Sequence, residues 1–198
     1  MTVSDKIPND EHVDGRLNRS TRTRAAIVQA LVELISQGVL IPTSEEVAEH
    51  AKVGLRTVFR HFEDMETLYK EVDRSITRMV QQDFDLMPVN APLEERITLL
   101  IDRRLALYDR INPYVASTLA RKWRSPFLER TYKGFAEVQR TYLIDMLPEI
   151  ASLEQPLQKM LDQLCSFDVW NRMRNTQGHS QKTIAEMLDV SIRAVLKP

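Results

Sequence analysis

Basic side chains are concentrated in two stretches of the sequence that contain no acidic residue. These stretches are residues 15–24, with Arg16, Arg19, Arg22 and Arg24, and residues 51–62, with Lys52, Arg56 and Arg60. Lysine and arginine neutralise nucleic-acid phosphates, and arginine also binds the O6 and N7 atoms of guanine. Both stretches are therefore candidates for contact with DNA. The first is equally compatible with a solvated tail and with an arm in the minor groove.

The remaining residue pattern does not favour catalysis or metal binding. The four histidines are scattered, and we find no nucleophile–base pair and no glycine-rich phosphate loop. We therefore expect no enzyme, no metal and no cofactor. We also expect the single cysteine, Cys165, to pack as a small apolar side chain rather than act as a redox sensor.

The composition is typical of a helical globular protein. Of the 198 residues, 43% are hydrophobic and 28% are charged, and only five are glycine, which leaves little material for the tight turns of sheets. The net charge of −1 argues against indiscriminate coating of nucleic acid but permits a local basic face. We predict an all-α fold. The sequence shows no secretory segment and no apolar run long enough for a membrane span, so we expect a cytoplasmic protein with no membrane partner.

The first two helices are predicted from their ends. A helical pattern of apolar residues starts at Thr21 and stops at Gly38, where a glycine typically caps a helix. Pro42 then precedes Thr43, whose hydroxyl is suited to cap a short second helix with acidic residues in its first turn. Residues 1–20 lack this periodicity and are predicted to form a flexible arm.

The second basic stretch includes a third helical segment, from Leu55 to His61. This segment is too short to be stable alone, so it must pack on its neighbours through Val58 and Phe62. A short turn separates it from the second helix. The arrangement predicts a helix-turn-helix domain over residues 21–64.

A larger helical body is predicted over residues 65–198. Asp64 is suited to cap a long fourth helix that runs until Pro88 and can connect two domains. The further helical patterns cover residues 93–111, 113–125, 127–147, 156–175 and 180–196.

The last helical pattern has two apolar faces. One face carries Ile184, Leu188 and Val195, and the other carries Met187, Val190 and Ala194. A helix with two apolar faces needs two packing partners, its own core and a second surface. We therefore expect a four-helix bundle between two subunits, to which the preceding segment contributes Leu157, Leu161, Leu164, Phe167 and Trp170.

The stretch from Thr23 to Leu68 resembles the DNA-binding domain of the TetR (tetracycline-repressor-like) family. The matching landmarks are Arg24-Ala25-Ala26-Ile27, Gly38, Thr43, the run from Val47 to Val53, the run from Thr57 to Phe62, and Leu68. The resemblance implies a transcriptional regulator, most often a repressor, that binds a palindromic double-stranded DNA operator as a homodimer. It also implies an unidentified small-molecule effector that binds the body, shifts the fourth helix and weakens DNA binding.

The resemblance assigns DNA contacts to particular residues. They are Arg24, Thr43, Lys52, Leu55, Arg56, Thr57, Phe59, Arg60 and His61. Arg56, Thr57 and Arg60 are expected to read bases in the major groove. Thr43, Lys52 and His61 are expected to bind phosphates.

Several residues depart from the family pattern. Lys52 stands where the family usually has glycine in the turn, and Gly54 stands where serine often caps the recognition helix. Phe59 stands where the family commonly has tyrosine, and Met65 stands where it commonly has lysine. Both substitutions remove a side chain that contacts the DNA backbone in the family. A small-molecule-binding or scaffold protein of the same fold that has lost DNA binding is therefore the alternative. An all-helical enzyme is a third class.

Aromatic residues of the body are candidates for a ligand pocket. The predicted lining residues are Arg104, Tyr108, Trp123, Phe127, Phe135 and Trp170. Aromatic residues at helical spacing also occur as ordinary core. The adjacent Arg103 and Arg104 are candidates for binding an anionic ligand, although surface or intersubunit salt bridges are the expected role.

Overall fold

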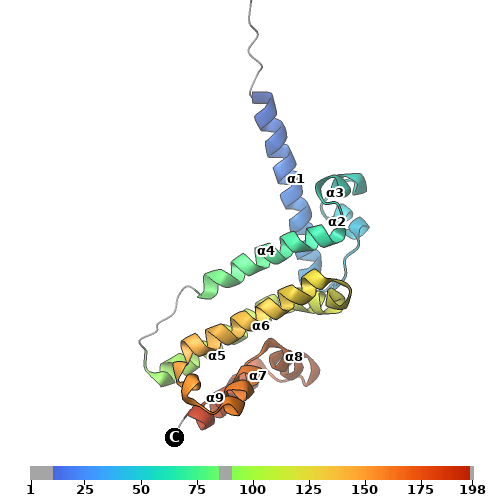
Figure 1. The fold of residues 1–198 in the computed structure, drawn as a ribbon. Coiled ribbons are helices and arrows are strands. Elements are labelled where there is room, and N and C mark those ends of the chain that lie inside the picture. Colours follow the sequence, from blue (N-terminus) through green and yellow to red (C-terminus); the bar gives the residue numbers. More distant parts are fainter. Residues whose placement is uncertain (1–10, 85–90, 197–198) are drawn as a thin grey trace, which may run out of the picture. The chain divides into compact units, whose positions relative to one another are not determined.

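The computed structural model describes residues 11–84 and 91–196, and over these residues its regular elements are all helical, which confirms the predicted fold class (Figure 1). The chain forms two compact units, Met1–Ser75 and Ile76–Pro198. The division lies inside the fourth helix, whereas the sequence pattern placed it before that helix. Within the described residues, no helix is both long and apolar enough to cross a membrane.

The first helix, α1, spans Glu11–Ser36 and is longer than predicted. The flexible arm expected over residues 1–20 is therefore wrong for residues 11–20, and residues 1–10 lie outside the described residues. No proline interrupts α1. A helix that is fixed by packing at Ile27 and Leu31 can extend into a polar segment, because each added residue also adds a hydrogen bond.

Helix α1 ends at the predicted glycine. Gly38 has a φ of +94°, the left-handed conformation in which glycine carries no steric penalty. The N–H of Val39 donates to the carbonyl oxygen of Leu34, and the N–H of Gly38 donates to that of Ile35, each at 3.0 Å. This pair of bonds is a Schellman motif, which satisfies carbonyls that the helix end leaves open.

Helices α2 (Ser44–His50) and α3 (Leu55–His61) lie where the sequence placed them. Thr43 caps α2, since its Oγ1 accepts a hydrogen bond from the N–H of Glu46 at 3.2 Å. The carboxylate of Glu46 accepts one from the N–H of Thr43 at 2.7 Å, which completes a capping box. Helix α2 contacts both α1 and α3 (Figure 1). These contacts form the predicted helix-turn-helix.

Helix α4 spans Met65–Phe84 and crosses the division between the units. Asp64 caps it by accepting a hydrogen bond from the N–H of Thr67 at 2.7 Å, and this bond lowers the pKa of the Asp64 carboxyl. The predicted end near Pro88 lies outside the described residues. The buried core of the first unit draws on all four helices through Ile27, Leu31, Ile35, Val47, Ala48, Val58, Phe62, Leu68 and Val72.

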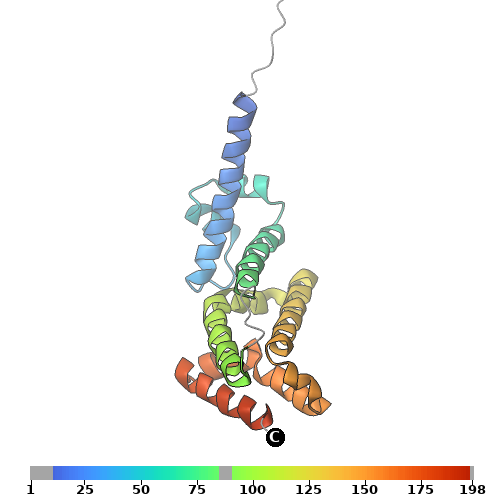
Figure 2. The same cartoon turned by 90° about the vertical axis from the view of Figure 1, so that its left-hand side faces the viewer.

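The second unit packs a set of helices around one apolar core. They are α5 (Leu93–Arg121), the 3₁₀ turn η1 (Lys122–Arg124), α6 (Pro126–Met146), the 3₁₀ turn η2 (Pro148–Ser152), α7 (Gln155–Leu164), α8 (Phe167–Asn171), the π-helical turn η3 (Arg172–Thr176) and α9 (Gln181–Leu196). Helix α5 contacts α6, α8 and α9. It is therefore the central helix of this unit. Figures 1 and 2 show the helices of this unit from two directions.

Helix α5 continues through Pro113, where the sequence pattern predicted a break between residues 93–111 and 113–125. Proline lacks the N–H that would donate to the carbonyl one turn earlier, so it weakens a helix interior. Here Ile111 and Val115 are buried on either side of Pro113. Packing on the core holds the helix together across the missing bond.

The predicted helix over residues 156–175 is interrupted at Cys165 and Ser166, which is a second correction. The carbonyl oxygen of Cys165 accepts hydrogen bonds from Nη1 of Arg104 at 2.6 Å and from the hydroxyl of Tyr108 at 2.8 Å. Ser166 caps α8 by accepting a hydrogen bond from the N–H of Val169. Side chains of α5 thus bind a backbone carbonyl at the break between α7 and α8.

The two predicted apolar faces of α9 have different environments. Ile184 and Leu188 are buried in the core of the unit, together with Ile192, which the sequence pattern did not single out, while Val195 is half-buried. The other face is exposed, with Met187 at 42% and Val190 at 68%. The described residues therefore leave an apolar face of α9 uncovered.

Helix α7 also has both buried and exposed apolar side chains. Leu161 is buried, whereas Leu157 and Met160 are exposed. Phe167 and Trp170, which were predicted to lie between subunits, are instead buried in the core of their own chain. Helix α8 contacts α5 in the same chain, which explains this correction.

Candidate nucleic-acid interface

Helix α3 presents a basic face that is held in place by a buried one. Val58 is 1% exposed and packs the helix onto the first unit, while Arg56, Phe59 and Arg60 are exposed. Leu55 is also exposed and Thr57 is half-buried. A short helix that is held in place before binding can present its side chains to a groove of DNA and does not have to become ordered first.

The turn before α3 contains the only non-glycine residue of positive φ among the described residues. Lys52 has a φ of +55°. The N–H of Val53 donates to the carbonyl oxygen of Ala48, and the N–H of Lys52 donates to that of Glu49, each at 3.0 Å. The turn is thus a Schellman motif, in which Lys52 occupies the position that Gly38 occupies after α1. The exposed Lys52 side chain lies next to α3 in sequence, where phosphate contact was predicted.

Arg24 makes its contacts inside the first unit. Its Nη1 donates to the carbonyl oxygen of His61 at 2.8 Å, and its Nη2 pairs with Oε2 of Glu71 at 3.1 Å. The guanidinium lies 4.2 Å from the ring centroid of Phe62, which favours a cation–π contact. Arg24 therefore ties α1 to the end of α3 and to α4. Glu71 could not be predicted as its partner, because the two residues are far apart in the sequence and meet only in the fold.

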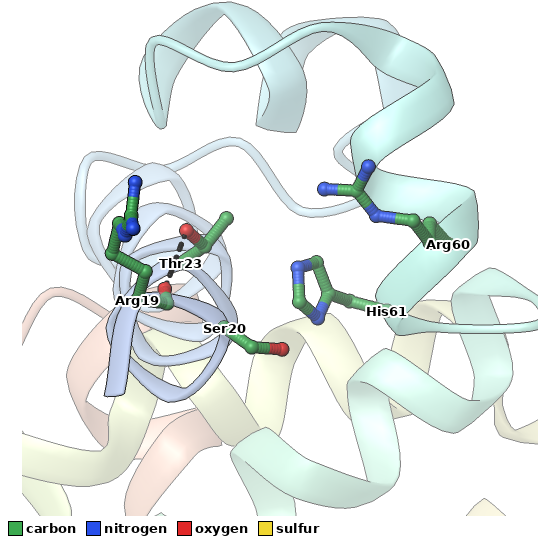
Figure 3. Close-up of a pocket in the computed structure, with 5 residues that line it drawn as sticks. All are labelled: Arg19, Ser20, Thr23, Arg60 and His61. Atoms are coloured by element: carbon green, nitrogen blue, oxygen red, sulfur yellow. Dashed lines mark hydrogen bonds between the residues drawn. The ribbon is translucent and has the colours of Figure 1, made fainter. Parts of the chain in front are cut away.

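A polar pocket lies between α1 and the last turn of α3. Its volume is about 380 Å³, and it is lined by Arg19, Ser20, Thr23, Arg60 and His61 (Figure 3). We call it the α1–α3 pocket. In Figure 3 the imidazole of His61 and the guanidinium of Arg60 extend from α3 toward α1. Its lining contains basic and hydroxyl side chains and no carboxylate.

His61 has an unusual environment in this pocket. The side chain is half-buried, and its Nε2 is buried without a hydrogen-bond partner in the part of the chain that the structure describes. Burial lowers the pKa of the imidazole below its ordinary value of 6.5, and the charges of Arg60 and Arg24 lower it further. This environment therefore disfavours the charged form of His61.

The six residues predicted to line a ligand pocket are only partly brought together. Arg104, Tyr108 and Trp170 are buried in the core of the second unit, and the half-buried Phe135 contacts Phe167 at a centroid distance of 6.2 Å. Trp123 is 71% exposed and its ring stacks on Arg124, so it lies on the surface. Phe127 is half-buried in the first turn of α6.

Arg104 and Tyr108 form a buried polar network. Arg104 donates from Nη1 to the carbonyl oxygen of Cys165 and from Nη2 to that of Gln139, and the Tyr108 hydroxyl bonds both Gln139 and the Cys165 carbonyl. Burial raises the pKa of the Tyr108 hydroxyl, so it remains protonated. Trp170 packs beside Tyr108, and its Nε1 is buried with no hydrogen-bond partner within the described residues.

Three solved structures are similar to nearly the whole chain. A transcriptional regulator from Rhodococcus sp. Rha1 has a TM-score of 0.66 at 17% identity, and covers 90% of this chain and 96% of its own. A TetR-family regulator from Mesorhizobium loti has a TM-score of 0.54 at 22% identity, with the same two coverages. A TetR/AcrR-family regulator from Aquifex aeolicus has a TM-score of 0.60 at 15% identity, and covers 87% and 99%. No protein-family model and no curated protein matches the sequence.

The chain has the fold of TetR-like transcriptional regulators. Within this TetR-like fold, sequence reasoning missed Ser20 and Thr23 as pocket residues and placed Arg19 in an arm that was either a solvated tail or a contact in the minor groove. Thr23 follows Ser20 by three positions and Arg19 by four, and both spacings bring side chains together on the surface of a helix. The signal was present, but it appears only when α1 is known to begin before Thr21.

Proposed function

We propose that the chain is a sequence-specific DNA-binding transcriptional regulator whose α3 enters the major groove. The observation that carries the proposal is the exposed face of α3, with Arg56 and Phe59 outward while Val58 anchors the helix. Similarity of fold to known transcriptional regulators supports the same function. The rival functions, a scaffold without DNA binding and an enzyme, leave this basic face without a role.

The exposed residues divide by chemistry into two kinds of contact. We assign base reading to Arg56 and Thr57, and apolar contact with thymine methyl groups to Leu55 and Phe59. We assign phosphate contact to Thr43, Lys52 and His61. Arg60 was predicted to read bases, but its guanidinium lines the α1–α3 pocket, which favours a phosphate. Arg24 is left out, because its donors are used within the unit.

We further propose that the regulator is a homodimer and represses transcription from a palindromic operator. The exposed apolar side chains of α9 and α7, which contact each other, provide a surface for a second copy of the chain. Two-fold symmetry would place two α3 helices in successive major grooves, about 34–36 Å apart. Bound there, the dimer would occlude the DNA from other proteins.

An effector site in the second unit is the last part of the proposal. Buried Trp170 has an N–H without a partner in the described part of the chain, and buried Arg104 binds backbone carbonyls. A ligand with a hydrogen-bond acceptor would satisfy the Trp170 N–H and compete for Arg104. An apolar small molecule with one acidic or carbonyl group fits this chemistry.

The test is selection of duplexes from a random-sequence pool by the full chain. We expect recovery of related palindromic sequences, and binding that weakens steeply with salt because phosphate contacts release counterions. The variant Arg56→Ala should select a less defined sequence, whereas Arg130→Ala, an exposed arginine of α6, should select the same sequence as the wild type. Failure to enrich any sequence would favour the scaffold or the enzyme instead.

A further inference from the structure

The lining of the α1–α3 pocket matches the chemistry of an oxyanion. Arg19 and Arg60 contribute guanidinium groups, and Ser20 and Thr23 contribute hydroxyls. These are donors that bind phosphate oxygens. The volume of about 380 Å³ corresponds to roughly a dozen water molecules, so a phosphate group fits with several waters.

His61 is the one lining residue whose charge can change near neutral pH. The charged groups around it are Arg60 on α3, Arg19 and Arg24 on α1, and Glu71 on α4, which is paired with Arg24. The charges of Arg60 and Arg24 oppose protonation of the imidazole. Nε2 of His61 is a buried polar atom without a hydrogen-bond partner within the described residues.

We propose that the α1–α3 pocket binds one phosphate-type oxyanion and that His61 takes up a proton when it does so. The favoured source is a backbone phosphate of DNA, because Arg60 and His61 belong to the helix assigned to the major groove; this part rests on the proposed function. An oxyanion would offset the surrounding positive charge and provide an acceptor for the imidazole. Binding and protonation would then support each other.

The sign of the pH effect follows from linkage. The pKa of His61 is low in the free protein and is raised when an oxyanion binds, so binding takes up a proton. Affinity is then independent of pH above the bound-state pKa and rises as pH falls toward the free-state pKa. Below the free-state pKa it is constant again. One such group changes affinity at most tenfold per pH unit.

The first experiment measures binding of the full chain to a duplex that it has selected from the random pool. Affinity is measured between about pH 6 and about pH 8 at constant ionic strength, the range in which histidine titrates. We expect wild-type affinity to rise about fivefold or more toward the lower pH, and the affinity of His61→Gln to stay flat. The control His50→Gln removes a histidine of the same unit, whose Nε2 pairs with Glu33 at 2.8 Å, and should retain the wild-type profile.

The second experiment follows the His61 imidazole by NMR while inorganic phosphate or the duplex is added to the full chain. A rise in the pKa of His61 with the duplex alone supports a DNA phosphate as occupant. A rise with inorganic phosphate as well, together with competition between the two, supports a pocket that also takes a free phosphate-bearing molecule. No rise with either, or a wild-type pH profile for His61→Gln, overturns the inference. If no duplex is bound at any pH, the proposed function fails, and the phosphate titration alone decides the pocket.

Discussion

Lys52 combines a strained backbone with an exposed charge. A residue with a Cβ loses about 1–2 kcal/mol in the left-handed region, whereas glycine does not. Glycine in turn loses more conformational entropy on folding, by about 0.5–1 kcal/mol. The side chain of Lys52 is exposed, so its ammonium group is accessible for the proposed contact with phosphate.

Two substitutions at Lys52 separate these roles. We expect Lys52→Gly to raise the free energy of unfolding by roughly 0.5–1 kcal/mol, since relief of strain exceeds the entropy cost. We expect Lys52→Ala to leave it nearly unchanged. Both variants should bind DNA more weakly. The slope of log affinity against log salt concentration should become shallower by about one for each chain. Urea unfolding and binding at several salt concentrations measure the two effects, and an unchanged salt dependence would remove Lys52 from the interface.

Arg56 should act on specificity rather than on general affinity. Loss of a bidentate contact to guanine in Arg56→Ala should weaken binding to the selected duplex by about 1–3 kcal/mol and relax base choice at one position of each half-site. Binding to unrelated duplexes should change little. Competition binding against single-base variants of the duplex measures this. Equal losses on every duplex would show that Arg56 binds a phosphate.

Arg24 should act on stability. Arg24→Ala leaves the His61 carbonyl and Glu71 without their partner, and we expect the free energy of unfolding to fall by about 1 kcal/mol. Arg22→Ala, at an exposed position of the same helix, should have no such effect. Chemical unfolding of both variants provides the measurement. If Arg24→Ala were as stable as the wild type and bound DNA less well, the contact predicted from sequence would be favoured instead.

At the scale of the elements, local signals were sufficient for α2 and α3 but not for α5 or α7. Thr43, Gly54 and Gly38 set helix ends through bonds to residues a few positions away, so sequence alone places them. The continuation through Pro113 and the break at Cys165 depend on contacts with distant parts of the chain. The exposed residues of α3 were predictable because they follow from these local signals. The contacts of Arg24 were not predictable, because they involve residues that are distant in the sequence.

The exposed face of α9 leads to a prediction about assembly. Val190→Glu places a charge at the centre of the proposed dimer surface without touching the buried residues Ile184 and Leu188. A desolvated, unpaired carboxylate in an interface costs several kcal/mol, so we expect monomers where the wild type forms dimers. Val138→Glu, at an exposed position of α6, is the matched control and should remain dimeric.

Sedimentation equilibrium measures the state of both variants. A shorter chain that ends after Gly178 is a weaker test, because it also removes Ile184, Leu188 and Ile192 from the core. A Val190→Glu protein that remains a stable dimer would place the interface elsewhere. The monomer should also lose affinity for a palindromic duplex, since the two half-sites would no longer be bound by one particle.

At the scale of the whole molecule, α4 is the element shared by the two units. Leu68 and Val72 belong to the core of the first unit, and Val80 belongs to the core of the second. The same continuous helix therefore has buried contacts on both sides of the division. We predict that a ligand that changes the packing around Val80 shifts this helix, on which the unit proposed to bind DNA also depends.

This arrangement predicts reciprocal coupling between effector and DNA. A ligand releases DNA only to the extent that it prefers the state that does not bind DNA, and a 100-fold loss of affinity requires about 2.7 kcal/mol of coupling. Small molecules that raise the melting temperature and quench Trp170 are the compounds to test. Titration calorimetry with and without the selected duplex measures both affinities. DNA should lower the affinity for the ligand by the same factor as the ligand lowers the affinity for DNA. A tight ligand of the second unit whose affinity is identical in both titrations would show that binding there is not coupled to α3.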